Sequence, residues 1–119
     1  MDFDVVIDRG RTFVRVTMTG APGIGELLSL IHLLGVESET WNDDRVVVDL
    51  RSVATVFTRY EHFRIGEEAA ASLSHMEKIA LLVPRERITR VTEKTARRMG
   101  ANMVVFDDEK SAVEWLRAD

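Results

Sequence analysis

The stretch Arg45-Val-Val-Val-Asp-Leu-Arg51 is the clearest strand in the chain and decides the fold class. Four of its seven residues are large and apolar and nearly continuous, whereas a strand with one face in water alternates apolar and polar side chains. We therefore expect this strand at the centre of a sheet that is covered on both faces. Lys78-Ile-Ala-Leu-Leu-Val83 is a second buried strand, which ends at Pro84.

Helices are predicted around these strands from their start and stop signals. Thr58-Arg-Tyr-Glu61 has the spacing of a capping box, so a helix is expected from Thr58 to about Ser74. Gly100 is a typical C-terminal cap for a helix over residues 85–99. The remaining predicted elements are strands over 3–7 and 12–19 joined by a tight turn in which Gly10 supplies a positive φ, a helix over 23–36 with Pro22 in its first turn, a strand over 103–106, and a last helix that is capped by Asp107 or Asp108 and runs to Leu116.

The order of elements is thus β-β-α-β-α-β-α-β-α, which predicts one α/β domain over residues 1–119. Strands that are separated by a single helix are parallel neighbours or near neighbours, joined by right-handed crossovers. The opening hairpin adds an antiparallel edge. We expect a mixed sheet of about five strands with helices on both faces.

Composition excludes several classes of protein. The chain has no Cys, which excludes disulfides and thiolate metal sites, and His32, His62 and His75 lack the i, i+4 spacing of metal ligands. Gly20-Ala-Pro-Gly-Ile-Gly25 matches neither glycine-rich phosphate-binding pattern, so we expect no metal and no cofactor. The longest apolar stretch, residues 27–36, is too short to span a bilayer, and the N-terminus has no signal-peptide pattern. We expect a cytoplasmic protein.

Three stretches carry a resemblance to a known family: Val-Val-Val-Asp-Leu-Arg at 46–51, Lys-Ile-Ala-Leu-Leu-Val at 78–83, and Val-Phe-Asp-Asp-Glu-Lys-Ser-Ala-Val-Glu-Trp-Leu at 105–116. With the order of the elements, they make the chain resemble the SpoIIAA-like family, a branch of the STAS-type fold. The ending is the most specific part. The resemblance implies a small bacterial domain without catalytic residues, similar in shape to lipid-carrying CRAL-TRIO domains, and hence binding of a hydrophobic ligand.

Anti-anti-sigma factors, which are relatives in that fold, carry Asp-Ser-Ser-Gly between the central strand and the next helix. Aligning Asp49-Leu50 and Val53 with the family pattern places Phe57-Thr58-Arg59-Tyr60 over this motif. Arg59 then stands in place of the phosphorylated serine, and of the two serine positions only Thr58 keeps a hydroxyl. Two interpretations of Thr58 stay open, as the N-cap of the following helix or as the phosphoacceptor of a regulatory switch.

The helix over residues 23–36 is apolar over more of its circumference than a sheet can cover. From Leu27 to Leu34 the apolar positions span about 220° of arc, where a core-facing stripe needs little more than about 100°. The surplus lies near Leu30 and Leu33. A loop, a second copy of the chain or an apolar ligand would cover it, since leaving two leucines in water costs about 1.5–3 kcal/mol each. Leu30, Leu33 and Leu34 are therefore candidate interface or ligand residues.

Polar candidates follow the central strand at its carboxyl end, where ligands of open α/β sheets bind. Asp49 and Arg51 share a face of the strand, so they either form an ion pair that closes it or bind a ligand, and Thr58 follows them. His62 is predicted on the buried face of the next helix. It is either a hydrogen-bonded core residue or a functional group that titrates near neutral pH.

The segment 85–98 is strongly basic. It has six cations against two acids and carries +4, while the remaining chain carries −8. Five of the cations fall within about 100° of one helical face: Arg87, Arg90, Lys94, Arg97 and Arg98. This row is either a solvated face paired with Glu86 and Glu93 at i, i+4, or a surface for a phospholipid headgroup or an acidic partner. Nucleic acid is disfavoured because the segment has no aromatic residue for base stacking.

These patterns favour a non-enzymatic binding or regulatory domain. We expect a homodimer that binds a partner protein or an apolar, lipid-like molecule in a cleft lined by the first and second helices. A hydrolase would need an activated serine beside a histidine and an acid, and the sequence has no Gly-x-Ser-x-Gly elbow between a strand and a helix.

Overall fold

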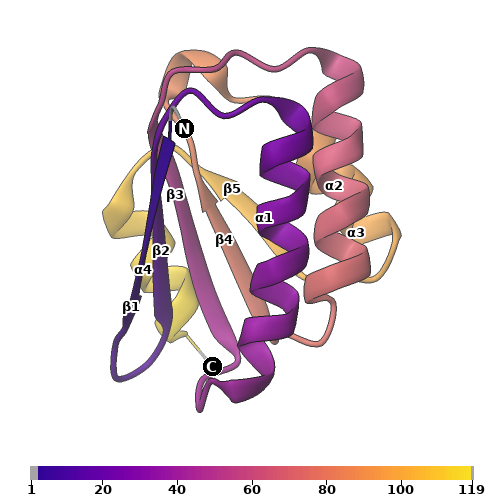
Figure 1. Cartoon of the computed structure of the whole chain (residues 1–119). Coiled ribbons are helices and arrows are strands. Elements are labelled where there is room, and N and C mark those ends of the chain that lie inside the picture. Colours follow the sequence, from indigo (N-terminus) through magenta and orange to yellow (C-terminus); the bar gives the residue numbers. More distant parts are fainter. Residues whose placement is uncertain (1–2, 119) are drawn as a thin grey trace.

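Five segments rich in valine, leucine and other apolar residues form a sheet with the strand order β1-β2-β3-β4-β5 (Figure 1). The computed structural model describes residues 3–118. The strands are β1 Phe3–Arg9, β2 Val14–Gly20, β3 Arg45–Val53, β4 Lys78–Leu82 and β5 Met103–Phe106. β1 is antiparallel to β2, and β2 to β5 are mutually parallel. The predicted mixed sheet with an antiparallel edge is confirmed.

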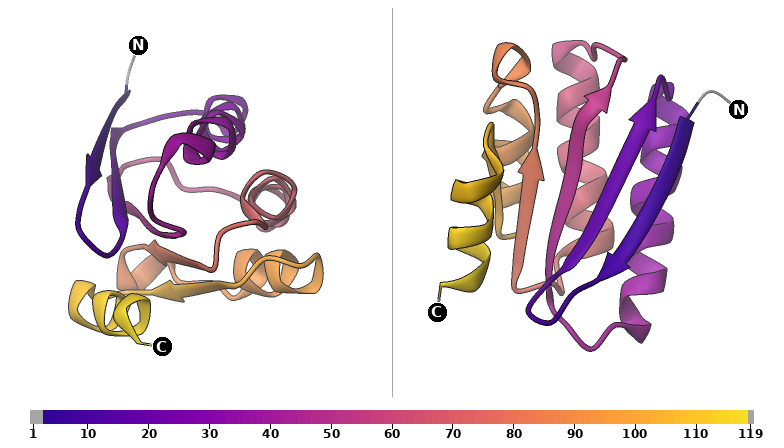
Figure 2. Two further views of the ribbon diagram at one scale, coloured as in Figure 1. Left: turned by 90° about the horizontal axis from the view of Figure 1, so that it is seen from below. Right: turned by 90° about the vertical axis from the view of Figure 1, so that its left-hand side faces the viewer.

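Helices cover both faces of the sheet, three on one side and one on the other (Figure 2). The helices are α1 Ile24–Glu37, α2 Arg59–Leu73, α3 Val91–Arg98 and α4 Glu109–Arg117. α1, α2 and α3 each connect two parallel strands, and crossovers of one hand place them on the same face. α4 follows β5 and packs on the opposite face, against β3, β4 and β5. Among residues 3–118, no helix has both the length and the apolar composition of a membrane span.

The central strand β3 is buried on both faces, as its apolar run predicts. Val46 and Val48 belong to the large core under the three helices. Val47 points the other way, into a smaller core beneath α4 that also contains Ala112 and Leu116. Side chains alternate across a strand, so only a strand with helices on both sides needs valine at successive positions.

The predicted helix ends are confirmed at three places. Thr58 caps α2, and Asp108, not Asp107, caps α4 by accepting a hydrogen bond of 2.9 Å from Ser111 N–H. Gly100 has φ +104° just after α3. The N–H of Ala101 donates to the carbonyl of Ala96 at 2.9 Å, which is the hydrogen bond of a Schellman motif.

The prediction of one helix over residues 85–99 is wrong. Arg85–Arg87 form a single 3-10 turn, Ile88 is extended, and α3 begins only at Val91. From this extended position Ile88 packs its side chain against the large core, and this burial favours the break in the helix. The Thr89 hydroxyl oxygen then accepts a hydrogen bond of 3.3 Å from the Val91 N–H, which satisfies one free donor at the start of α3.

Two smaller predictions on turns are also wrong. Gly10 does not have a positive φ, because the hairpin loop spans residues 10–13 and is too long to need one. A Cβ at position 10 would lie 2.8 Å from the Phe13 carbonyl oxygen, so close approach explains the glycine. Pro22 precedes the N-cap Gly23 of α1 and lies outside the first turn, where it is fully buried.

Candidate functional site

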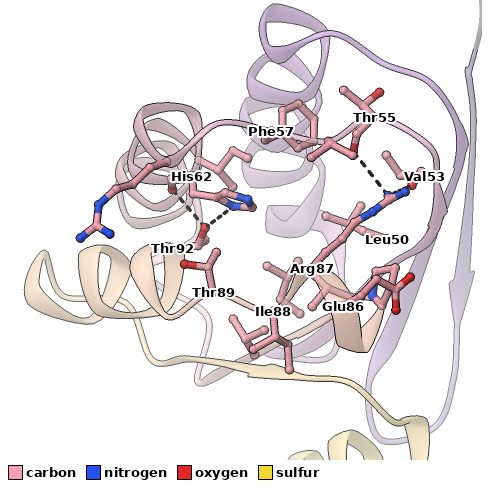
Figure 3. A pocket seen from close by; sticks show the side chains of 17 residues that line it. Leu50, Val53, Thr55, Phe57, His62, Glu86, Arg87, Ile88, Thr89 and Thr92 are labelled. Carbon is pink, nitrogen blue, oxygen red and sulfur yellow. Dashed lines mark hydrogen bonds between the residues drawn. The ribbon is translucent and has the colours of Figure 1, made fainter.

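A cavity of about 350 Å³ lies at the carboxyl ends of β3 and β4, between α2 and the segment that leads into α3 (Figure 3). Its lining is mainly apolar and comes from segments far apart in sequence. The apolar lining residues are Leu50, Val53, Val56, Phe57, Ile65, Leu81, Val83, Pro84, Ile88 and Val105. In open α/β sheets ligands bind at this edge, and pockets for small molecules have volumes of about 300–1,000 Å³.

The break before α3 creates this cavity. Because the chain makes a 3-10 turn after Pro84 and starts α3 only at Val91, a space remains between the strand ends and α2. Arg87 ties the 3-10 turn to the opposite side of the cavity, since its guanidinium donates to the carbonyl oxygens of Val53 and Thr55 at the end of β3 and in the loop after it. Figure 3 shows Arg87 reaching across to these residues.

His62, in the first turns of α2, is a polar group on the α2 wall of the cavity, which Arg59 also lines. Its Nδ1 lies 3.1 Å from the hydroxyl oxygen of Thr92, and its ring meets Phe57 edge-on at 6.2 Å between centroids. α3 can come this close because Gly66 has no side chain: a Cβ there would lie 2.7 Å from the Thr92 carbonyl oxygen. Burial lowers the pKa of His62, although the charge of Glu61 raises it, so the imidazole is neutral at pH 7.

Comparisons with known proteins place the chain in a family. The sequence profile of the SpoIIAA-like family matches residues 14–117. The chain belongs to the SpoIIAA-like family. No curated protein matches it. An anti-sigma factor antagonist from Mycobacterium paratuberculosis has a similar structure, with a TM-score of 0.67 and 13% identity over 98% of this chain and 95% of that one. An uncharacterized protein from Shewanella loihica PV-4 with a SpoIIAA-like fold has a TM-score of 0.58 and 12% identity, over 97% and 94%. At these identities the two structures support the fold.

Thr58 of this SpoIIAA-like domain serves as the N-cap of α2. Its hydroxyl oxygen accepts from the Glu61 N–H at 3.1 Å, and the Glu61 carboxylate accepts from the Thr58 N–H at 2.8 Å. This is the predicted capping box. Thr58 is exposed and lies beside the cavity loop without lining the cavity. Its use as a phosphoacceptor stays a prediction.

Asp49 and Arg51 lie on the opposite face of the sheet from the cavity, near α4. Arg51 donates to both carboxylate oxygens of Asp49 at 3.0 and 2.9 Å, and Arg15 adds a third contact of 3.0 Å. Glu109 accepts from both arginines. Burial alone would raise the pKa of Asp49, but the hydrogen bonds and charges of Arg51 and Arg15 outweigh it and lower the pKa. Asp49 and Arg51 form the predicted ion pair, and Thr58 is not part of the cluster. Ligand binding by Asp49 and Arg51 stays a prediction.

The apolar surplus of α1 is covered in large part by the chain itself. Leu34 is buried, and Leu30 is half-buried against the large core. α2 supplies the second cover, because Gly35 brings the two helices so close that a Cβ would lie 2.5 Å from the Ser72 carbonyl oxygen. Of the three candidate leucines, only Leu33, which is 61% exposed, could still contact a ligand or a second protein. None of the three lines the cavity.

The prediction of five cations on one helical face is wrong because two of them precede α3. Arg87 is tied to the loop after β3, and Arg90 donates to Glu93 at 3.0 Å and to the Val105 carbonyl at 3.1 Å. Arg97 donates to the Met103 carbonyl at 2.7 Å. Three of the five side chains therefore hold the fold together through carbonyl oxygens.

Lys94 and Arg98 remain exposed and join α2 in a shallow groove. The groove also contains Arg59 and the ring pair of Tyr60 and Phe63, whose centroids are 6.4 Å apart. Within residues 3–118, the structure shows no ion pair to any of the three cations. We call this groove between α2 and α3 the cation–aromatic groove.

Sequence reasoning found His62 and Thr58 but missed the cavity and Thr92, the hydrogen-bond partner of His62 in its lining. The break before α3, which leaves room for the cavity, did have signals in the sequence. These are Pro84, just before the predicted helix, and the β-branched residues Ile88 and Thr89 inside it. Proline favours an extended or turn conformation nearby, and β-branched residues are poorer helix formers.

Proposed function

We propose that this SpoIIAA-like domain is a binding domain with a regulatory role, and that its ligand is a small, largely apolar molecule in the cavity between α2 and the segment that leads into α3. The cavity itself is the observation that carries the proposal: about 350 Å³, walled mainly by apolar side chains, at the sheet edge where α/β folds bind ligands. Burial of apolar ligand surface against these walls would supply about 25 cal/mol per Å².

Ligand titrations followed by amide NMR spectra test this function. We expect 1-octanol to shift the amides of the cavity segments, 53–65 and 83–92, and to leave those of β1 unchanged. The substitution Ile88→Trp fills the cavity and should abolish binding. Val36→Trp, a matched change on the exposed side of α1, should leave binding intact. Binding that survives Ile88→Trp, or that perturbs residues throughout the sheet, would place the ligand elsewhere.

A second candidate function is docking of a regulatory protein, and the cation–aromatic groove favours it. Three cations that form no ion pair with any other described residue line the groove beside an exposed ring pair, which suits an acidic segment with an apolar side chain. One of the structurally similar proteins is an anti-sigma factor antagonist. Thr58 lies next to Arg59, so a phosphate on Thr58 would compete with an acidic partner for the same cations.

Charge reversal tests this second function. A synthetic peptide of glutamates around a central phenylalanine should bind the wild type and lose binding to the double variant Lys94→Glu, Arg98→Glu. The double variant Arg11→Glu, Lys110→Glu has the same net charge and should bind like the wild type. Thr58→Glu should weaken binding of the peptide, whereas Thr58→Ala should leave it unchanged. Equal binding by both double variants would remove the groove as the docking site.

A further inference from the structure

The imidazole of His62 and the hydroxyl of Thr92 fix one another's hydrogen positions in the cavity wall (Figure 3). The Thr92 hydroxyl oxygen lies 3.0 Å from the backbone carbonyl oxygen of His62 and 3.1 Å from Nδ1 of the same residue. A threonine hydroxyl has one hydrogen, and a carbonyl oxygen can only accept. The hydroxyl hydrogen therefore goes to the carbonyl, and Nδ1 must donate to the hydroxyl oxygen.

This assignment leaves Nε2 of His62 as a lone-pair acceptor. A neutral imidazole carries one N–H, and here Nδ1 holds it. Within residues 3–118 the structure shows no hydrogen bond to Nε2, and the ring lines the cavity among apolar side chains such as Phe57 and Ile65. The edge-on contact with Phe57 and the Thr92 bond hold the ring in this orientation.

We propose that Nε2 of His62 is the polar anchor of the cavity and that it selects an apolar ligand carrying a hydrogen-bond donor, an alcohol or a phenol, over one that carries only acceptors. The inference rests on the proposed function, binding of an apolar molecule in this cavity. An ionised carboxylate is disfavoured, because its oxygens only accept and would face the lone pair of Nε2. Nη1 of Arg87 donates to the carbonyl oxygens of Val53 and Thr55, which holds this guanidinium against the loop after β3.

The tautomer is tested without any ligand by the ¹⁵N chemical shifts of the histidine side chains at pH 7.5. We expect His62 to show a protonated Nδ1 and an unprotonated Nε2. Exposed His32 serves as the internal control, because its Nδ1 lies 4.0 Å from a Glu68 carboxylate oxygen and no hydroxyl among residues 3–118 bonds to it. A protonated Nε2 in His62 overturns the inference and leaves the proposed cavity function untouched.

Selectivity is tested with two isomers of equal size, 1-octanol, which has a hydroxyl donor, and heptyl methyl ether, which has only an acceptor. We expect the wild type to bind 1-octanol about tenfold more tightly, the effect of one hydrogen bond. His62→Phe should bind both probes equally, and His32→Phe should keep the preference. Equal affinities in the wild type overturn the inference but not the cavity function. If neither probe binds the wild type, the proposed function fails as well.

Discussion

At the scale of single residues, substitutions of Thr58 measure how much an N-cap contributes to stability. We expect Thr58→Ala to lower the free energy of unfolding by about 1 kcal/mol, because the Glu61 N–H loses its acceptor at the start of α2. Thr58→Ser keeps the hydroxyl and should lose little. Urea unfolding followed by far-UV circular dichroism measures both. If the alanine variant is as stable as the wild type, the capping box contributes nothing to stability.

His62 makes stability depend on pH. Because burial lowers its pKa in the folded protein, the unfolded chain binds the proton more readily, and protonation favours unfolding. The stabilising effect is therefore complete above the ordinary histidine pKa of about 6.5 and is lost as the pH falls through the lower folded value. The wild type should lose stability between pH 7.5 and pH 5 by more than His62→Phe does, in urea unfolding at each pH. Parallel curves for the two proteins would contradict the buried, neutral histidine.

At the scale of the elements, glycines decide how closely helices approach. Gly35→Ala should destabilise the protein by about 1–3 kcal/mol, because the new Cβ would lie 2.5 Å from the Ser72 carbonyl oxygen of α2. Gly25→Ala, in the same helix, has no atom within 4 Å of its new Cβ and should stabilise by about 0.4–1 kcal/mol. Thermal unfolding of the two variants separates packing from helix propensity. Stabilisation by both alanines would show that α1 and α2 can move apart at little cost.

At this scale one can also see which structural features local sequence patterns predict. The buried centre of β3, the caps Thr58 and Gly100, and a cap at Asp107 or Asp108 follow from short patterns, because each depends on residues a few positions away. The start of α3 does not. Ile88 leaves the helical path to fill a core built by other segments, and Arg87 bonds to the loop after β3. Such contacts across the fold override a local preference for helix.

At the scale of the whole molecule, the cavity was beyond prediction for the same reason. Its walls join residues 50–65, 81–92 and Val105, and no spacing within one segment indicates that the three meet. The sequence places Asp49 and Thr58 near one strand end, but alternation across the sheet separates them by putting Asp49 on the α4 side. The apolar surplus of α1 was visible in the sequence, whereas its cover, α2, required the fold.

The homodimer expected from the sequence stays a prediction, and the structure indicates where to test it. Arg9 of β1 pairs with Glu37 of α1 at 3.4 Å, so these two ends lie side by side. They carry three exposed apolar side chains, Ile7, Leu33 and Val36, beside charges of both signs. A patch of this kind can meet its own copy across a twofold axis, with apolar contacts at the centre and opposite charges at the rim.

We expect the wild type to sediment as a dimer at high protein concentration and Leu33→Glu to sediment as a monomer, because two copies of the new carboxylate would face each other near the axis. Met99→Glu, a charge placed on an exposed apolar side chain at the end of α3, should leave the dimer intact. Sedimentation velocity over a range of concentrations measures all three proteins. A wild type that is monomeric throughout contradicts the dimer. A dimer that only Met99→Glu disrupts would move the interface to α3, beside the cation–aromatic groove.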